Sequence, residues 1–347
     1  MMKVCVLGYN PTKIGGIESF SRNLKEIINY TVEFVYEYNE QGPFEIDGKR
    51  PVLEYNKLNR FFNKVSFSKY SLYKIKRQLS LGNYDVVIAN SPKYLDVIPN
   101  LNKVILVQHT TVENMWSSKF KFNKNKKLLE LSRQVYKIIS LSDLEREALI
   151  TKFGYQDNKV FTINMINTLP IRRKISKPKK SLVMLTRFQN EIKRLDLVIN
   201  AMKLLPDFQL NIYGNGIDED YLKEISEDLS NVNVYPATTD KQYILDNNGI
   251  YVISSEFEGF PVSLLEALSR GLPVIVRNSF LSAPCFIKNN GVLLDKEWSD
   301  ERFCEAVNYC YENYEMLSAN SILESSRYSK SKLAPIWNQL ISELYRI

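Results

Sequence analysis

The sequence predicts an α/β protein built of two domains, each with a doubly wound parallel β-sheet. Short apolar runs of strand length alternate with segments whose apolar residues recur at helical spacing. This alternation stops in a charged, proline-containing stretch at 166–178 and then begins again. The length of 347 residues also exceeds that of a single hydrophobic core. Strands that are apolar throughout are typical of parallel sheets covered by helices on both faces.

The first domain is predicted over residues 1–165, and its first strand is "KVCVLG". This strand ends in a glycine and leads into a helix that extends to about Ile28. Ser142 and Glu145 are placed to form a capping box at a later helix, and Gly154 lies where that helix would end. The remaining strands are predicted in "YDVVIAN", "KVILVQHT" and "KIISLS".

The second domain is predicted over residues 166–330, with strands in "SLVMLTRF", "FQLNIYG", "YVISS" and "LPVIV". Helices are expected at about 195–205 and 261–270. The last segment, 331–347, is predicted to be a helix that packs back on the first domain through one apolar stripe. That stripe consists of Leu333, Ile336, Trp337, Leu340, Leu344 and Ile347.

The composition indicates a cytoplasmic protein. The formal net charge is +7, and basic residues cluster at 119–127 and 172–180, either as solvent-exposed loops or as sites that attract anions. The four cysteines lack a metal-binding spacing, so reduced thiols are expected. No apolar run is long enough for a signal peptide or a membrane span, so any membrane contact is expected to be peripheral, at the inner face of the cell membrane. The aromatic residues are scattered through core-like segments, which argues against a nucleic-acid partner.

Two acids in "EFEGFPVSLLEALSRGLPVIV" indicate a ligand site. Glu258 precedes a predicted helix that starts near Pro261, and Glu266 lies within that helix. The free amides at the helix N-terminus, around 262–264, suit a phosphate. Glu266 would then accept from sugar hydroxyls beyond that phosphate, and Glu258 would lie on its other side. The alternative interpretation makes Glu258 a loop charge and Glu266 a surface residue of the helix.

This stretch resembles the E-x7-E signature of retaining glycosyltransferases of family 4, which have the GT-B fold of two Rossmann-like domains that face a central cleft. Three further stretches agree in order: "GYNPTKIGGIESF" is similar to the N-terminal glycine loop, "MLTRFQNEIKRLDLVINAMKLL" to the phosphate-binding segment and "LNIYGNGID" to the G-x-G strand end. The resemblance spans nearly the whole chain. A dinucleotide oxidoreductase is disfavoured because no G-x-G-x-x-G follows the first strand.

The resemblance implies a role for each matching residue. Arg187 and Lys193 hold the donor diphosphate, Glu266 holds the ribose and Glu258 faces the donor sugar. The backbone completes the sugar and phosphate site at Gly259, Phe260, Pro261, Val262 and Ser263.

In the first domain, the resemblance places Gly15 and Gly16 where the backbone approaches the phosphates, and His109 where the family often has a histidine facing the donor sugar. The implied catalytic set is therefore Glu258, His109, Arg187 and Lys193.

Two departures from the family pattern lie beside these residues. Lys193 follows Arg187 by six positions where five is usual, and Arg194 stands where glycine is common, so the two cations at 193 and 194 can share or exchange the phosphate role. Thr186 replaces the glycine before Arg187.

The function implied by the resemblance is retaining, metal-independent transfer of a hexosyl unit from a nucleotide sugar, with a UDP-sugar favoured over a GDP-sugar. The acceptor would be a glycan or a lipid-linked oligosaccharide in cell-surface polysaccharide biosynthesis, and no cofactor is needed besides the donor as co-substrate. Two alternatives stay open: a GT-B nucleotide-sugar epimerase, and a non-catalytic member that acts as a partner protein.

Residues 60–79 are predicted to form one helix that combines an apolar face with six basic residues. Phe61, Val65, Leu72, Ile75 and Leu79 would share that face. A helix that faces the core and a helix that contacts an anionic membrane surface both fit this pattern.

Overall fold

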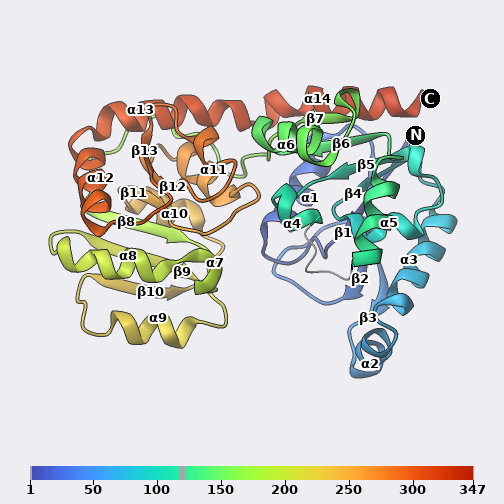
Figure 1. Ribbon diagram of the computed structural model, residues 1–347, viewed down its shortest axis with the longest axis horizontal. Helices are drawn as coiled ribbons and strands as arrows, with labels where there is room; N and C mark the ends of the chain where they lie inside the picture. Colours follow the sequence, from blue (N-terminus) through green and yellow to red (C-terminus); the bar gives the residue numbers. More distant parts are fainter. Residues whose placement is uncertain (1, 117–121, 347) are drawn as a thin grey trace. The chain divides into compact units, whose positions relative to one another are not determined.

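The computed structural model describes residues 2–116 and 122–346 and divides into two compact units (Figure 1). Unit 1 comprises Met1–Ile166 together with Lys330–Ile347, and unit 2 comprises Asn167–Ser329. Each unit carries one parallel sheet, which confirms the predicted fold class.

The sheet of unit 1 has seven strands in the order β3-β2-β1-β4-β5-β6-β7. Every neighbouring pair is parallel. The strands are β1 (Lys3–Gly8), β2 (Thr31–Asn39), β3 (Lys49–Glu54), β4 (Val86–Ala89), β5 (Val104–Val107), β6 (Lys137–Ser140) and β7 (Val160–Thr162). The helices are α1 (Gly16–Ile27), α2 (Lys57–Val65), α3 (Lys69–Gly82), α4 (Val112–Trp116), α5 (Phe122–Ser132), α6 (Asp143–Phe153) and α14 (Lys330–Tyr345).

The C-terminal helix α14 packs within unit 1, against α1 and β4. Trp337 is fully buried and its ring lies 5.8 Å from that of Phe20 in α1. The buried residues of the stripe are Leu333, Trp337, Leu340 and Leu344. Ile336 is 46% exposed, so its predicted place in the stripe is wrong; Ile341 is buried instead, because it follows Trp337 by one helical turn. Ile347 lies outside the described residues.

The predicted capping box at α6 is only half present. Ser142 Oγ accepts a hydrogen bond from the amide of Glu145 (3.2 Å), and Gly154 ends the helix with a φ of 66°. The Glu145 carboxylate does not complete the box, because Oε2 instead accepts from Gln108 Nε2 and from the amide of Val112, both at 2.9 Å.

The sheet of unit 2 has six parallel strands in the order β10-β9-β8-β11-β12-β13. The strands are β8 (Ser181–Leu185), β9 (Gln209–Gly214), β10 (Val232–Pro236), β11 (Ile250–Ile253), β12 (Val274–Arg277) and β13 (Gly291–Leu294). The helices are α7 (Asn190–Lys193), α8 (Leu195–Ala201), α9 (Glu219–Ser226), α10 (Lys241–Asn247), α11 (Val262–Ser269), α12 (Asp300–Glu312) and α13 (Tyr314–Ser325).

The two charged runs differ in how much of each is described. Residues 119–121 of the 119–127 segment lie outside the described residues. The 172–180 run is mostly exposed, and two of its cations pair locally: Arg172 with Asp246 at 3.5 Å and Lys180 with Asp207 at 3.3 Å. No helix among the described residues is long and apolar enough to cross a bilayer.

The single helix predicted at 60–79 is wrong. Two helices, α2 and α3, meet at a turn over residues 66–68, where Phe67 and Ser68 have φ values of 50° and 67°. A left-handed backbone at two successive residues cannot continue a right-handed helix. The predicted common face is therefore split: Ile75 and Leu79 of α3 are buried, whereas Phe61 and Val65 of α2 are exposed.

Both sheets share the strand order of a doubly wound fold, which reverses beside the first strand of each unit. Ligands bind such sheets beyond the carboxyl ends of the strands on either side of this reversal. In unit 2, these strands are β8 and β11, and the loops that follow them carry Arg187 and Glu258. In unit 1, they are β1 and β4, and Gly15 and Asn90 follow them.

Candidate active site

The loop between β11 and α11, which carries Glu258, is fastened at several points. Ser254 Oγ donates to the carbonyl of Lys193 (2.8 Å), and the amide of Glu256 donates to the carbonyl of Ile192 (2.7 Å). Ser282 Oγ donates to the carbonyl of Gly259 (3.1 Å). These bonds tie the loop to α7 and to the segment after β12, so the position of Glu258 is set before a ligand arrives.

Glu258 forms an ion pair with one of the predicted phosphate ligands. Its Oε1 accepts from Lys193 Nζ (2.5 Å) and from Ser255 Oγ (2.7 Å). The side chains of Glu258 and Lys193 are 17% and 18% exposed, so the pair is largely shielded from water. The structure thus brings together Glu258, which was predicted to face the donor sugar, and Lys193, one of the two residues predicted to hold the diphosphate.

Glu266 has partners that the sequence did not reveal. Both of its carboxylate oxygens accept from Lys241 Nζ, at 2.8 and 2.9 Å, and Oε1 also accepts from the hydroxyl of Thr168. The Glu266 side chain is 1% exposed, so the interpretation of this residue as a surface charge of the helix is wrong. A carboxylate offers about four lone-pair positions, so these three hydrogen bonds leave one for a sugar hydroxyl.

The N-terminus of α11 offers fewer free amides than predicted. Pro261 is the N-cap and has no amide hydrogen, and the amide of Leu264 donates to the Pro261 carbonyl (3.1 Å). Among the described residues, the amides of Val262 and Ser263 have no acceptor. The ring of Phe260 packs 4.7 Å from Phe286, so this residue presents its backbone rather than its ring to a ligand.

Arg187 lies on a loop that passes over the G-x-G motif at the end of β9. The amide of Thr186 donates to Tyr213 O (3.0 Å), and the amide of Phe188 donates to Asn215 O (2.9 Å). A Cβ on Gly214 would stand 1.9 Å from the Thr186 carbonyl oxygen, so only glycine permits this approach. Arg187 is exposed, and its guanidinium has no partner within the described parts of the chain.

Gly214→Ala should therefore displace the loop that carries Arg187. We expect a loss of about 1–3 kcal/mol in the free energy of unfolding, as for other overpacking substitutions, and a weaker affinity for the donor. Chemical denaturation and calorimetric titration with the donor measure the two effects. Asn215→Ala is the matched control, because this exposed neighbour lies between the two glycines; an equal effect of both variants would contradict the prediction.

Arg194 is not equivalent to Lys193. Its guanidinium forms two bonds of 3.1 Å to the carboxylate of Asp196, so it cannot exchange roles with Lys193 without breaking them. Its φ of 48° is left-handed, which explains physically why a glycine suits this position.

His109 follows β5 in unit 1, and a short network fixes its tautomer. Asn90 Nδ2 donates to Ser21 Oγ (2.9 Å), so Asn90 presents Oδ1 to the imidazole. His109 Nε2 lies 2.9 Å from that oxygen and must be the donor, which leaves Nδ1 unprotonated. Burial lowers the pKa of His109 to about 3, so the imidazole is neutral at physiological pH.

Gly15 is the N-cap of α1, and Gly16 is the first residue of that helix. The space where Gly15 would carry a Cβ lies 2.1 Å from a carboxylate oxygen of Glu18. This acid lies in the first turn of α1, where a phosphate was predicted to approach.

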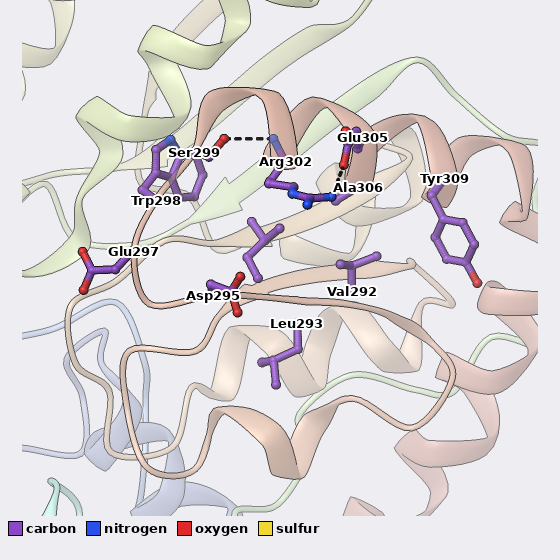
Figure 2. A pocket seen from close by; sticks show the side chains of 11 residues that line it. Val292, Leu293, Asp295, Glu297, Trp298, Ser299, Arg302, Glu305, Ala306 and Tyr309 are labelled. Atoms are coloured by element: carbon purple, nitrogen blue, oxygen red, sulfur yellow. Dashed lines mark hydrogen bonds and ion pairs between the residues drawn. The ribbon is translucent and has the colours of Figure 1, made fainter.

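A pocket of about 310 Å³ lies elsewhere on unit 2, between β13 and the start of α12 (Figure 2). Ser299 caps α12 by accepting from the amide of Arg302 (3.2 Å), and Trp298 Nε1 donates to Asp300 (2.7 Å). The pocket shares no lining residue with the predicted site, so it does not bear on the donor.

Two doubly wound units, with Arg187, Lys193 and Glu258 at the reversal point of unit 2, define a class of two-domain α/β protein whose ligands bind beyond the carboxyl ends of the strands. Residues 166–322 match the family model described as glycosyl transferases, group 1. The whole chain is similar to an uncharacterized glycosyltransferase of Haemophilus influenzae, with 26% identity over 98% of this chain and 100% of that protein.

Two further relatives have more informative descriptions. An O-antigen biosynthesis glycosyltransferase of Escherichia coli is 25% identical over 80% of this chain and 82% of its own length. The GtfA subunit of the UDP-N-acetylglucosamine–peptide N-acetylglucosaminyltransferase of Streptococcus agalactiae is 25% identical over 76% of this chain. This chain covers 56% of the length of that subunit.

Solved structures agree on the fold. The pneumococcal O-GlcNAc transferase GtfA, in complex with UDP and GlcNAc, matches with a TM-score of 0.77 and 14% identity over 99% of both chains. A sucrose-phosphate synthase from Thermosynechococcus elongatus matches with a TM-score of 0.78 and 14% identity over both chains in full. These two proteins differ in activity, so this likeness establishes the GT-B fold alone. Together with the family match, it supports a GT-B glycosyltransferase.

Proposed function

We propose that the protein is a retaining hexosyltransferase of family 4, which transfers a sugar from a UDP-sugar to a glycan or a lipid-linked oligosaccharide in cell-surface polysaccharide biosynthesis. The observation that carries this proposal is the cluster at the reversal point of unit 2. There, Lys193 and Glu258 are in contact, Arg187 is unpaired within the described residues, and two free amides of α11 follow Glu258. Cations and amides suit a diphosphate, and an acid beside them suits a sugar.

In this proposal, Arg187, Lys193 and the amides of Val262 and Ser263 stabilise the negative charge that develops on the departing diphosphate. Lys193 must then turn partly from Glu258 towards the phosphate. The acceptor attacks from the face that the diphosphate leaves, and a phosphate oxygen takes the acceptor proton. Glu258 stays beside the sugar and favours the positive charge that develops there.

His109 is a candidate acceptor of a hydrogen bond from the donor sugar. Its neutral state and its Nε2–H bond to Asn90 leave Nδ1 as an acceptor, so it would bind a sugar hydroxyl without a charge of its own. Glu266, with one lone pair left beside Lys241 and Thr168, would accept from one ribose hydroxyl.

UDP is favoured as the nucleotide because a relative is named as a UDP-N-acetylglucosamine transferase and a structural neighbour binds UDP and GlcNAc. The polysaccharide acceptor is supported by the relative named for O-antigen biosynthesis. The decisive test is a panel of UDP- and GDP-sugars measured by thermal unfolding, followed by product analysis with the sugar that stabilises. A donor at a hundred times its Kd should add about 2.7 kcal/mol to the stability.

Each outcome of this test separates the candidates. Sugar transfer only in the presence of an acceptor supports the proposal, whereas conversion of the nucleotide sugar without an acceptor would identify an epimerase. Stabilisation by GDP-sugars alone would overturn the choice of nucleotide. Donor binding without any turnover on a panel of acceptors would favour the non-catalytic alternative.

Activity should survive EDTA, because the cations and amides named above supply the charge that a divalent metal would otherwise supply. The chain has one D-x-D sequence, at Asp218–Asp220, and Asp218 Oδ2 already accepts from the amide of Asn190 (2.6 Å). Initial rates with EDTA and with added Mg²⁺ are the measurement. A complete loss in EDTA that Mg²⁺ restores would contradict metal-independent transfer.

A further inference from the structure

Helix α2 presents its apolar side to solvent. Leu58, Phe61, Phe62 and Val65 follow the spacing of one helix face, and we call them the α2 apolar face. These four side chains are between 50% and 64% exposed. Phe67, in the turn that follows, is 80% exposed and extends the same surface. Figure 1 shows α2 at the edge of unit 1, beyond β3.

The polar side of α2 faces the protein instead. Asn63 is the one buried residue of this helix; its Nδ2 donates to Tyr38 (2.8 Å), and its Oδ1 accepts from the amide of Ser71 (3.1 Å). Asn59 Nδ2 donates to the carbonyl of Glu54 (2.9 Å). An amphipathic helix on the surface of a water-soluble domain normally has the opposite orientation. The α2 apolar face therefore stays exposed because asparagine contacts hold the helix in place.

The chain segment that carries this face has one sign of charge. From Lys57 to Tyr84 the sequence contains no acidic residue. It contains seven basic residues there, namely Lys57, Arg60, Lys64, Lys69, Lys74, Lys76 and Arg77. Six of them are exposed, and Lys74 is half-buried.

We propose that α2 and the turn at 66–68 form a docking surface for an anionic lipid bilayer, with the α2 apolar face at the boundary of headgroups and acyl chains and the cations on lipid phosphates. Exposed phenylalanine and leucine residues among lysine and arginine residues are typical of helices that lie in a membrane interface. A second copy of the chain fits poorly, because like-charged surfaces would meet. The inference goes beyond the proposed function and does not depend on its chemistry.

Vesicle co-sedimentation of the full chain tests this inference, with phosphatidylcholine vesicles that either contain or lack phosphatidylglycerol. The wild type should bind the anionic vesicles and bind phosphatidylcholine alone much more weakly. Phe61→Gln with Val65→Gln should weaken binding at least tenfold, because the apolar contact is lost. Lys57→Gln with Lys64→Gln should weaken it about fivefold for each cation removed.

Two controls distinguish loss of the α2 surface from a general loss of exposed apolar residues and from unfolding. Ile217→Gln with Leu323→Gln replaces apolar residues of unit 2 that are 87% and 71% exposed, and it should leave vesicle binding unchanged. Thermal unfolding of every variant should match the wild type, because all substituted side chains are exposed.

Three results would overturn the inference: no binding of the wild type to anionic vesicles, equal binding to phosphatidylcholine alone, or undiminished binding of the Phe61/Val65 variant. Self-association that depends on the α2 apolar face, without vesicle binding, would assign the surface to a second copy.

Discussion

Replacing Arg187 or Lys193 with alanine should lower kcat/KM by an amount that corresponds to about 2–4 kcal/mol of lost transition-state stabilisation, because each variant lacks a cation that would stabilise the departing diphosphate. The two variants should differ in stability. Arg187 is exposed and unpaired within the described residues, so its loss should leave the free energy of unfolding unchanged. Lys193→Ala leaves Glu258 without its ion-pair partner and should destabilise the fold modestly, since the pair is not fully buried. Steady-state kinetics and chemical denaturation measure both quantities.

Arg194→Ala is the matched control for these two cations. Its side chain is adjacent in sequence to Lys193 but is held by Asp196, so we expect a much smaller loss of kcat/KM. Near-normal turnover of both Arg187→Ala and Lys193→Ala would show that neither residue contacts the donor phosphates. A loss in Arg194→Ala as large as in Lys193→Ala would show that the phosphate site lies one residue further along.

The central strands of both sheets could be predicted from the sequence, whereas several others could not. Runs such as "VVIA" and "YVI" are apolar throughout because helices cover both faces of the sheet. Strand β2 gave no such run, because it contains Glu33 and Glu37. Glu33 is nevertheless buried, since Tyr84 and Arg50 donate to its carboxylate at 2.7 Å each. An acid paired by residues distant in sequence cannot be recognised as a core position from its own segment.

The candidate site shows the same limit. The helix that carries Glu266 was predicted within one residue of its observed bounds, because proline and glycine mark its ends. Its partners Lys241 and Thr168 were missed, since they lie 25 and 98 residues away in sequence and no local pattern marks them. The split of 60–79 into two helices was also missed, because the turn at 66–68 has the sequence Ser-Phe-Ser and so lacks the glycine or proline that usually marks a helix end.

Glu258→Gln and Glu266→Gln should fail in different ways, because the two acids are proposed to contact opposite ends of one donor. Glu266 would hold a ribose hydroxyl that does not change during the reaction, so its loss should weaken binding in the ground and transition states alike. Glu266→Gln should raise the KM and increase the Kd for UDP about tenfold, as expected for a lost hydrogen bond to a charged group. Glu258 faces the sugar as positive charge develops, so Glu258→Gln should lower kcat about a hundredfold and barely change the Kd for UDP.

The structure suggests a control variant, at Lys241, that separates a contact between Glu266 and the ribose from the ion pair that holds the Glu266 carboxylate. Lys241→Met keeps Glu266 but removes the cation that bonds both of its carboxylate oxygens. The Thr168 hydroxyl is then the remaining donor to Glu266 among the described residues. The Lys241 side chain is 29% exposed, so in the Glu266→Gln variant its ammonium group can be solvated by water. The free energy of unfolding of Glu266→Gln should therefore fall by about 1 kcal/mol.

All three variants are measured by steady-state kinetics and by calorimetric titration of UDP and GDP, well below the unfolding temperature. If Glu258→Gln loses as much UDP affinity as Glu266→Gln, or if the two patterns are reversed, the proposed direction of the donor along α11 is wrong. If Lys241→Met alone matches the UDP affinity lost in Glu266→Gln, Glu266 acts by holding Lys241 in place rather than by binding the ribose.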